Sequence, residues 1–182
     1  GETYGDDEGE TTDFGNFELF DITGRKFEDA NGDGDDEDGG DAAPDVVFKI
    51  GLFILTDGVA AAEPAETTNT LVDGTYSFEG LGPLAANQTY AVRELGYYDG
   101  SSYVDGVAVI PADSFVAIDA DGTAWEQTFG ADGHAIVVAS GETYGDDEGE
   151  TTDFGNFELA TIAGYKFWDF DRNGEWDGED EG

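Results

Sequence analysis

The chain has 182 residues, of which 44 are acidic and 6 are basic, and its formal net charge is −38. This charge disfavours nucleic acid and anionic membranes as partners, and the absence of cysteine excludes disulfides and thiolate metal sites. No apolar run approaches the roughly 20 residues of a membrane span, so we expect no membrane insertion.

The acidic residues are concentrated near the two ends of the chain. Residues 1–42 hold 16 acids, residues 141–182 hold 14, and the 98 residues between them hold the other 14. Adaptation to salt would make the whole surface acidic, whereas cation binding would concentrate acids in particular segments. The distribution favours cation binding, and adaptation to salt can hold beside it.

A long repeat organises the sequence. Residues 1–19 recur without change at 141–159, and matches at the same offset of 140 continue beyond them. We therefore expect residues 1–19 to end one repeat module, residues 20–159 to form a full module, and residues 160–182 to begin the next. The alternative is a single domain with duplicated ends that exchange strands between subunits.

The elements predicted in chain order are strands, and no segment keeps a helical period. Residues 14–27 read as a strand or strand pair, residues 46–56 as a buried central strand, and residues 60–70 as an exposed loop. Further strands are expected at 75–78, 88–95, 107–110, 115–119, 124–129 and 135–139. Many short strands with frequent turns predict an all-β, Ig-like or prealbumin-like β-sandwich in tandem repeats, without significant helix.

The segment after the first predicted strand has the spacing of a calcium loop. Calcium takes six to eight oxygen ligands, which a loop can supply from alternate positions around a glycine at position six. Asp29, Asn31, Asp33 and Gly34 follow this pattern, and the pattern returns 140 residues later. The predicted calcium ligands are Asp29, Asn31, Asp33, Asp35, Glu37 and Asp41 in the first loop, and Asp169, Asp171, Asn173, Glu175, Asp177 and Asp180 in the second.

The twelfth position, where a helix-loop-helix calcium hand has glutamate, is Gly40 in the first loop, so the last ligand of that loop stays open. Magnesium fits less well because it keeps several waters, and zinc is disfavoured because the only nitrogen ligand is His134. A solvated acidic loop without an ion is the remaining alternative.

A second acidic cluster precedes each expected module joint and lacks the loop spacing. Its residues either share an ion with the loop beyond the joint or form a solvated turn. They are Asp6, Asp7, Glu8 and Asp13, repeated as Asp146, Asp147, Glu148 and Asp153. No linker rich in proline, serine or glycine separates the expected modules, which favours a rod over a flexible string.

Two runs of residues resemble a known family. They are Asp13-Phe14-Gly15-Asn16-Phe17 and Ile22-x-Gly24-x-Lys26-Phe27-x-Asp29-x-Asn31-Gly32-Asp33-Gly34, both repeated near the end of the chain. They are similar to the B-repeat domains of serine-aspartate repeat surface proteins (SdrD B-like), which are related to Cna-B and transthyretin-like modules. The resemblance implies calcium-stabilised Ig-like sandwiches arranged in tandem as an extracellular stalk.

The resemblance also raises the question of covalent crosslinks. Related collagen-binding-type modules carry intramolecular isopeptide bonds of lysine, and the lysines here are Lys26, Lys49 and Lys166. Lys26 and Lys166 share one repeat position. We interpret Lys26 as a lysine that snorkels to an acidic neighbour, in preference to a crosslinking lysine.

We therefore expect a structural repeat of an extracellular or cell-surface filament, rigidified by calcium, whose partners are neighbouring copies end to end and in lateral contact. The alternative is an adhesin or carbohydrate-binding module that presents residues 96–140, with Tyr97, Tyr98 and Tyr103 as an aromatic platform. No catalytic constellation stands out, so we do not expect an enzyme. Asn87 begins a glycosylation sequon.

Overall fold

The computed structural model describes residues 15–34, 42–118, 120–137, 139–145, 152–170 and 172–176. Strands, turns and extended segments account for these residues, and none of them forms a helix that could cross a membrane. The strands are β1 (Phe20–Glu28), β2 (Phe48–Thr56), β3 (Val59–Ala60), β4 (Glu66–Asn69), β5 (Thr75–Leu81), β6 (Gln88–Tyr98), β7 (Ser102–Val104), β8 (Val107–Val109), β9 (Phe115–Ala117), β10 (Trp125–Phe129), β11 (His134–Ile136), β12 (Thr143–Tyr144) and β13 (Phe154–Glu158).

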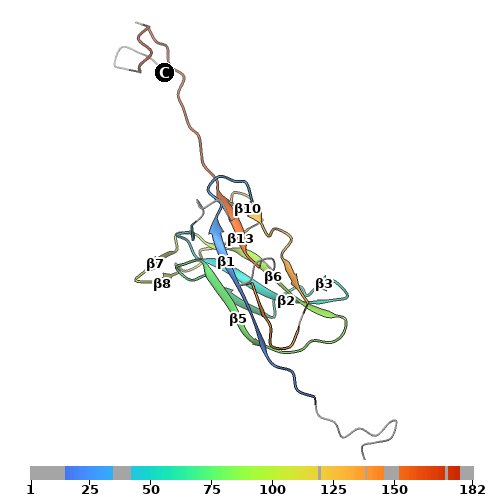
Figure 1. The fold of residues 1–182 in the computed structure, drawn as a ribbon. Coiled ribbons are helices and arrows are strands. Elements are labelled where there is room, and N and C mark those ends of the chain that lie inside the picture. Colours follow the sequence, from blue (N-terminus) through green and yellow to red (C-terminus); the bar gives the residue numbers. More distant parts are fainter. Residues whose placement is uncertain are drawn as a thin grey trace, which may run out of the picture.

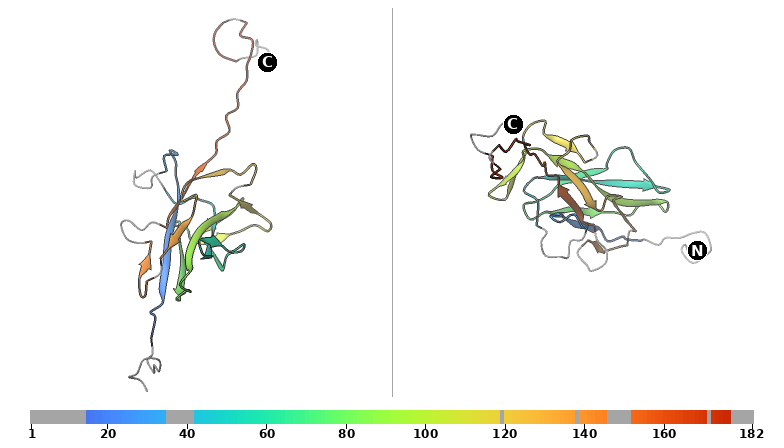
Figure 2. Two further views of the ribbon diagram at one scale, coloured as in Figure 1. Left: turned by 90° about the vertical axis from the view of Figure 1, so that its right-hand side faces the viewer. Right: turned by 90° about the horizontal axis from the view of Figure 1, so that it is seen from above.

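The strands form two packed sheets and a small hairpin (Figure 2). The first sheet has the order β10-β13-β1-β12, and β5 pairs with β1. The second has the order β11-β6-β2-β3, with β4 beside β2 and β9 beside β6, while β7 and β8 pair only with each other. The predicted β-sandwich is therefore confirmed.

The core lies between the two sheets because side chains alternate along each strand. Phe20 and Ile22 of β1 point inward and meet Ile50 of β2 and Val92 of β6, all at most 2% exposed. Full burial of such a side chain contributes about 1.5–3 kcal/mol. A second cluster of Phe48, Tyr97 and Trp125 continues the core.

The first and last strands of the sandwich run parallel and side by side. β13 pairs with β1 in the register Lys26↔Phe154 and Glu28↔Asn156, and β12 pairs with the start of β1. The chain therefore enters the sandwich at one end and leaves it at the other, where residues 159–168 continue as an extended segment (Figure 1).

Several details differ from the sequence-based expectations. The segment 60–70, expected to be a loop, contributes β4, which pairs with β2 as an edge strand. The segment is rich in Ala, Glu and Thr, a composition that is compatible with an exposed edge strand but is also typical of a loop. The prediction of a loop was based on that composition. The strands β3, β7, β12 and β13 were not predicted, and β1 begins only at Phe20.

Candidate functional site

The turn after β1 is the predicted calcium loop, and its first residue is buried. The Asp29 carboxylate is 0% exposed and accepts hydrogen bonds from the N–H groups of Gly32 at 2.7 Å, Asp33 at 3.2 Å and Gly34 at 2.9 Å. Asn31 accepts from the Asp33 N–H at 2.9 Å. The turn therefore wraps its own backbone around one carboxylate.

The second loop repeats this local structure. Asp169 accepts from the N–H groups of Asn173 at 3.1 Å and Gly174 at 3.0 Å. Gly34 and Gly174, at the sixth position of each loop, have positive φ angles of 74° and 80°. This is the left-handed conformation that glycine adopts without steric cost, so the glycine at position six has the predicted conformational role in both copies.

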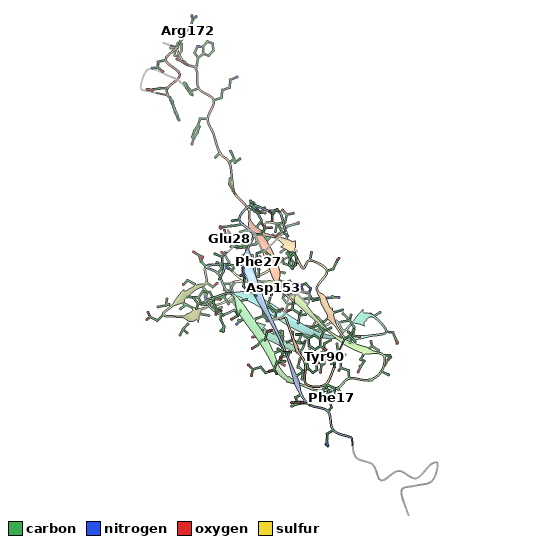
Figure 3. All side chains as sticks on the ribbon, viewed as in Figure 1. Phe17, Phe27, Glu28, Tyr90, Asp153 and Arg172 are labelled. Atoms are coloured by element: carbon green, nitrogen blue, oxygen red, sulfur yellow. The ribbon has the colours of Figure 1, made fainter. Side chains whose placement is uncertain are left out.

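The two loops differ in their surroundings. In the first, Gly32 approaches the ring of Phe157, and Gly34 approaches the backbone oxygen of Thr128. The second loop lies at the far end of the extended C-terminal segment, where Figure 3 labels Arg172. Among the residues that the structure describes, the first loop is therefore packed against the sandwich, beside the strand through which the chain leaves, whereas a methyl group added at Gly174 of the second loop would meet no other atom within 4 Å.

The electrostatics of Asp29 favour its charged form. Burial alone would raise the pKa of the Asp29 carboxyl, but the Thr128 hydroxyl and the N–H groups of Gly34, Gly32 and Asp33 outweigh burial and lower this pKa. An ionised carboxylate with amide and carboxylate oxygens in the same turn suits a hard cation such as calcium.

Much of the predicted ligand set falls outside the described residues, namely Asp6, Asp7, Glu8, Asp13, Asp35, Glu37, Asp41, Asp146, Asp147, Glu148, Asp171, Asp177 and Asp180. Within the described ranges, no three His, Cys, Asp or Glu side chains gather as a metal site. Asp29, Asn31 and Asp33 share the first turn, and Asp169, Asn173 and Glu175 lie in the second loop. Calcium binding stays a prediction.

Asp153, from the second acidic cluster, has a structural role in the sandwich. Its Oδ1 accepts a hydrogen bond from the backbone N–H of Arg25 at 2.6 Å, and the neighbouring Thr152 hydroxyl donates to the Thr23 carbonyl. These bonds hold the start of β13 against β1. Figure 3 places Asp153 within the sandwich and Arg172 far from it, so the structure does not bring Asp153 to the second loop.

The most unusual side chains of the molecule are three polar groups in the core. Lys26 of β1 and Asn156 of β13 are 0% exposed, and Glu94 of β6 is 6% exposed. Each follows the inward phase of its strand: Lys26 is in phase with Ile22, Glu94 with Val92 and Asn156 with Phe154. Lys26 has an acidic neighbour as expected, the Glu94 carboxyl, but it does not snorkel to the surface, because its strand phase directs the amine between the sheets.

The Glu94 carboxyl bridges the other two groups. The Asn156 Nδ2 donates to the Glu94 Oε1 at 2.6 Å, and the Glu94 Oε2 lies 3.9 Å from the Lys26 Nζ. The Lys26 amine donates to the carbonyls of Phe27 at 2.8 Å and Phe154 at 3.2 Å. Among the described residues, nothing donates a hydrogen bond to the Glu94 Oε2 or the Asn156 Oδ1.

Two aromatic rings lie next to the Lys26 amine. The Lys26 Nζ lies 4.6 Å from the centroid of the Phe48 ring and 5.8 Å from that of Phe27. Burial lowers the pKa of Lys26 from 10.5 to about 8, although the negative charges of Glu94, Asp29 and Glu28 oppose the change. Burial likewise raises the pKa of Glu94 from 4.5 to about 7, against the effects of Lys26 and Asn156.

This arrangement is costly as a stabilising device. A buried ion pair seldom repays the desolvation of its charges, and each unsatisfied buried acceptor costs about 1–3 kcal/mol. The site instead combines a readily neutralised amine, a carboxamide and a readily protonated carboxyl in a dry core. Those are the components of an acyl transfer from asparagine to lysine.

Glu94 and Asn156 were absent from the sequence-based site. Strand phase gave a signal for Glu94, because Tyr90-x-Val92-x-Glu94 places its side chain on the inward face with Tyr90 and Val92. For Asn156, the strand Phe-Gly-Asn-Phe-Glu is too short to show a clear period. What the sequence could not supply was the tertiary arrangement: β13 pairs with β1 and brings Asn156 near Lys26, and the second sheet packs on the first and brings Glu94 there.

The aromatic platform expected for the alternative function is not formed. Tyr97 is 4% exposed and packs with Phe48 in the core, and the Tyr103 hydroxyl donates to the Thr70 carbonyl at 2.7 Å. Tyr98 packs against Phe115. Asn87 lies exposed in the turn before β6, where its side chain donates to Asp57 at 3.2 Å.

Comparison of the chain with protein-family models, curated proteins and solved structures found no match. The resemblance to the B-repeat domains therefore remains a matter of the quoted residues. The sandwich and its buried site are known from the geometry of this chain alone.

Proposed function

We propose that this chain is a structural repeat of an extracellular filament or surface stalk, built as a rod of sandwiches that resist extension. In this proposal each sandwich is closed by an amide bond between Lys26 and Asn156, and calcium at the loop after β1 stiffens the end through which the chain leaves. One observation carries the proposal: a buried carboxyl, Glu94, contacts both a lysine on the first strand and an asparagine on the last.

The reaction follows from the three side chains. The neutral Lys26 amine attacks the Asn156 carboxamide carbon, the bond from that carbon to Nδ2 breaks, and ammonia leaves. Glu94 takes a proton from the attacking amine and delivers one to the leaving nitrogen, ending in its initial state. Proton transfer by a positioned group typically contributes 10²–10⁴-fold to a rate, so we assign Glu94 this catalytic role.

The position of the bond gives it a mechanical purpose. Because β1 and β13 are parallel neighbours, a pull on the two ends of the sandwich would load them in shear. The amide would carry this load directly from Lys26 to Asn156 and leave the chain between them unloaded. By constraining the unfolded chain as a disulfide does, it would also add roughly 5 kcal/mol to the free energy of unfolding.

Calcium would act at the adjacent loop. The backbone N–H of Asp29 donates to the carbonyl of Asn156 at 2.8 Å, so the first residue of the loop is tied to the strand that carries the crosslink. Asp29, Asn31 and Asp33 would hold the ion, which supplies neutralising positive charge at a crowded acidic turn. This role agrees with the concentration of acids in the loops.

Peptide mapping tests the proposal. Protease digestion of the wild-type chain should release a branched peptide that joins the Lys26 segment to the Asn156 segment. Lys26→Arg should abolish it, Glu94→Gln should reduce its rate of formation roughly a hundredfold or more, and the matched control Lys49→Arg should leave it unchanged. Recovery of only linear peptides from the folded wild-type chain would refute the crosslink.

A further inference from the structure

The segment that precedes β1 is a second copy of the crosslinking strand. Residues 15–19 have the same sequence as residues 155–159, so Asn16 corresponds to Asn156 and Gly15 to Gly155. Yet their surroundings differ. Asn156 is buried in the site described above, whereas Asn16 is exposed, and a methyl group added at Gly15 would meet no other atom within 4 Å.

The topology prevents Asn16 from reaching the lysine of its own chain. Asn16 lies four residues before β1, which itself carries Lys26. Two parallel strands need a crossover of a dozen or more residues between them, and this connection is far shorter. Asn16 therefore cannot meet Lys26 of its own sandwich in the manner of Asn156, whereas a second copy of this chain offers a Lys26 that it can meet.

We propose that residues 15–19 of one copy can take the place of β13 in a second copy, where Asn16 becomes covalently joined to Lys26. This inference rests on the proposed crosslink. The visiting strand would restore the same pairing with β1 and place an identical carboxamide beside Glu94, because the two segments share their sequence. The partner is thus a second copy of this chain, and the place of joining is the groove between β1 and β10.

The chemistry balances as in the intramolecular case. A bond forms between the Lys26 Nζ of one copy and the Asn16 Cγ of the other, the bond from Cγ to Nδ2 breaks, and one molecule of ammonia leaves. Glu94 of the receiving copy moves the proton from the amine to the leaving nitrogen. No oxidant, reductant or further reactant is needed.

Competition decides when this exchange occurs. The chain's own β13 is tethered, and a short tether corresponds to an effective concentration of the order of millimolar, so it normally occupies the groove first. A visiting strand succeeds at high protein concentration or where the resident strand lacks its asparagine. Each copy then offers one donor, Asn16, and one acceptor, Lys26. Copies can therefore join head to tail into open chains of increasing length, which appear as a ladder of covalent multimers.

The test removes the resident asparagine. Asn156→Ala is refolded at about 1 mM and at a hundredfold lower concentration, and the products are separated under denaturing conditions and weighed by mass spectrometry. We expect a ladder of covalent multimers at the higher concentration, each joint lighter by one ammonia. The ladder should be lost in Asn16→Ala/Asn156→Ala. Asn156→Ser serves as a second acceptor variant should the alanine variant fold poorly.

Addition of Gly15→Ala to the Asn156→Ala variant tests the docking of the visiting strand more specifically. Gly155 in β13 lies so close to the Phe27 ring that a methyl group there would collide with it. The groove of the second copy should therefore reject a visiting strand that carries Gly15→Ala, and the ladder should fall at least tenfold. A folded acceptor variant that stays monomeric at both concentrations, beside a wild-type chain that crosslinks internally, would overturn this inference alone. A wild-type chain without its internal crosslink would overturn the proposed function as well.

Discussion

The side chains of Glu94 and Asn156 share a buried hydrogen bond of 2.6 Å between the two sheets of the sandwich. Both strands that carry them direct apolar residues to the same layer, so a carboxyl and a carboxamide meet where hydrophobic packing is expected. With the Lys26 amine 3.9 Å from the other carboxyl oxygen, the contact has a chemical explanation in amide bond formation.

Under force, the crosslinked sandwich should not extend. Lys26 and Asn156 are 130 positions apart, which corresponds to about 440 Å of extended chain. In single-molecule pulling from the two ends, the wild-type chain should show no step of this length, and Asn156→Ala should show it. A wild-type step of about 440 Å would mean that the chain between these residues bears load.

The uncrosslinked sandwich should have a stability minimum near neutral pH. In Asn156→Ala, Lys26 and Glu94 both remain. Burial raises the pKa of Glu94 to about 7 in the presence of Asn156, against 4.5 when unfolded, and the variant loses the Asn156 hydrogen bond that lowers this pKa. The folded state therefore binds more protons in this window, so stability falls as pH rises through it. The lowered pKa of Lys26, about 8 against 10.5, means that stability rises again above pH 8.

The fall below neutral pH and the rise above pH 8 each change the free energy of unfolding by an amount of the order of 3 kcal/mol. Urea unfolding at pH values from 4 to 11 measures it, and Glu94→Gln in the same background should remove the fall between about pH 4.5 and 7. A profile that Glu94→Gln leaves unchanged would show that Glu94 does not titrate in this window.

Calcium should stabilise the sandwich through the first loop only. At a hundredfold excess over the Kd, an ion that binds only the folded state adds about 3 kcal/mol to the free energy of unfolding. Asp29→Asn should abolish the rise of Tm with calcium because it removes the buried charge, whereas Asp169→Asn, at the same repeat position, should keep it. Equal calcium responses in both variants would place the ion elsewhere.

Two glycines of identical local sequence should respond differently to alanine. Gly155→Ala should destabilise the sandwich by about 1–3 kcal/mol, because its methyl group would collide with the Phe27 ring in a packed layer. Gly15→Ala should leave Tm unchanged, because open space surrounds Gly15. Thermal melts of the two variants compare these effects directly, and equal destabilisation would contradict the assignment of residues 154–158 as β13.

Sequence patterns predicted the sandwich because a nearly continuous apolar run along residues 46–56 and apolar alternation along residues 88–95 report burial directly. They failed at 60–70, where an exposed edge strand resembles a loop, and at β13, where Phe-Gly-Asn-Phe-Glu is too short to show a clear period. The first turn of the calcium loop was predictable because its glycine and aspartate act locally, within six residues.

The buried site was harder to predict because it depends on contacts between distant strands. Lys26, Glu94 and Asn156 come from three strands, and they meet through the pairing of β1 with β13 and the packing of β6 from the opposite sheet. A lysine in phase with Ile22 was visible in the sequence, but snorkelling is the commoner fate of such a residue. The burial of Lys26 between the two sheets, which is a tertiary property, decided against it.

The most direct test of the central claim is the mass of the denatured wild-type chain. If Lys26 and Asn156 are joined, this mass is lower than the mass of the sequence by one ammonia. It should return to the value expected from the sequence in Asn156→Ala and in Lys26→Arg, while the Lys49→Arg control keeps the deficit. A folded wild-type chain at its full sequence mass would contradict the account.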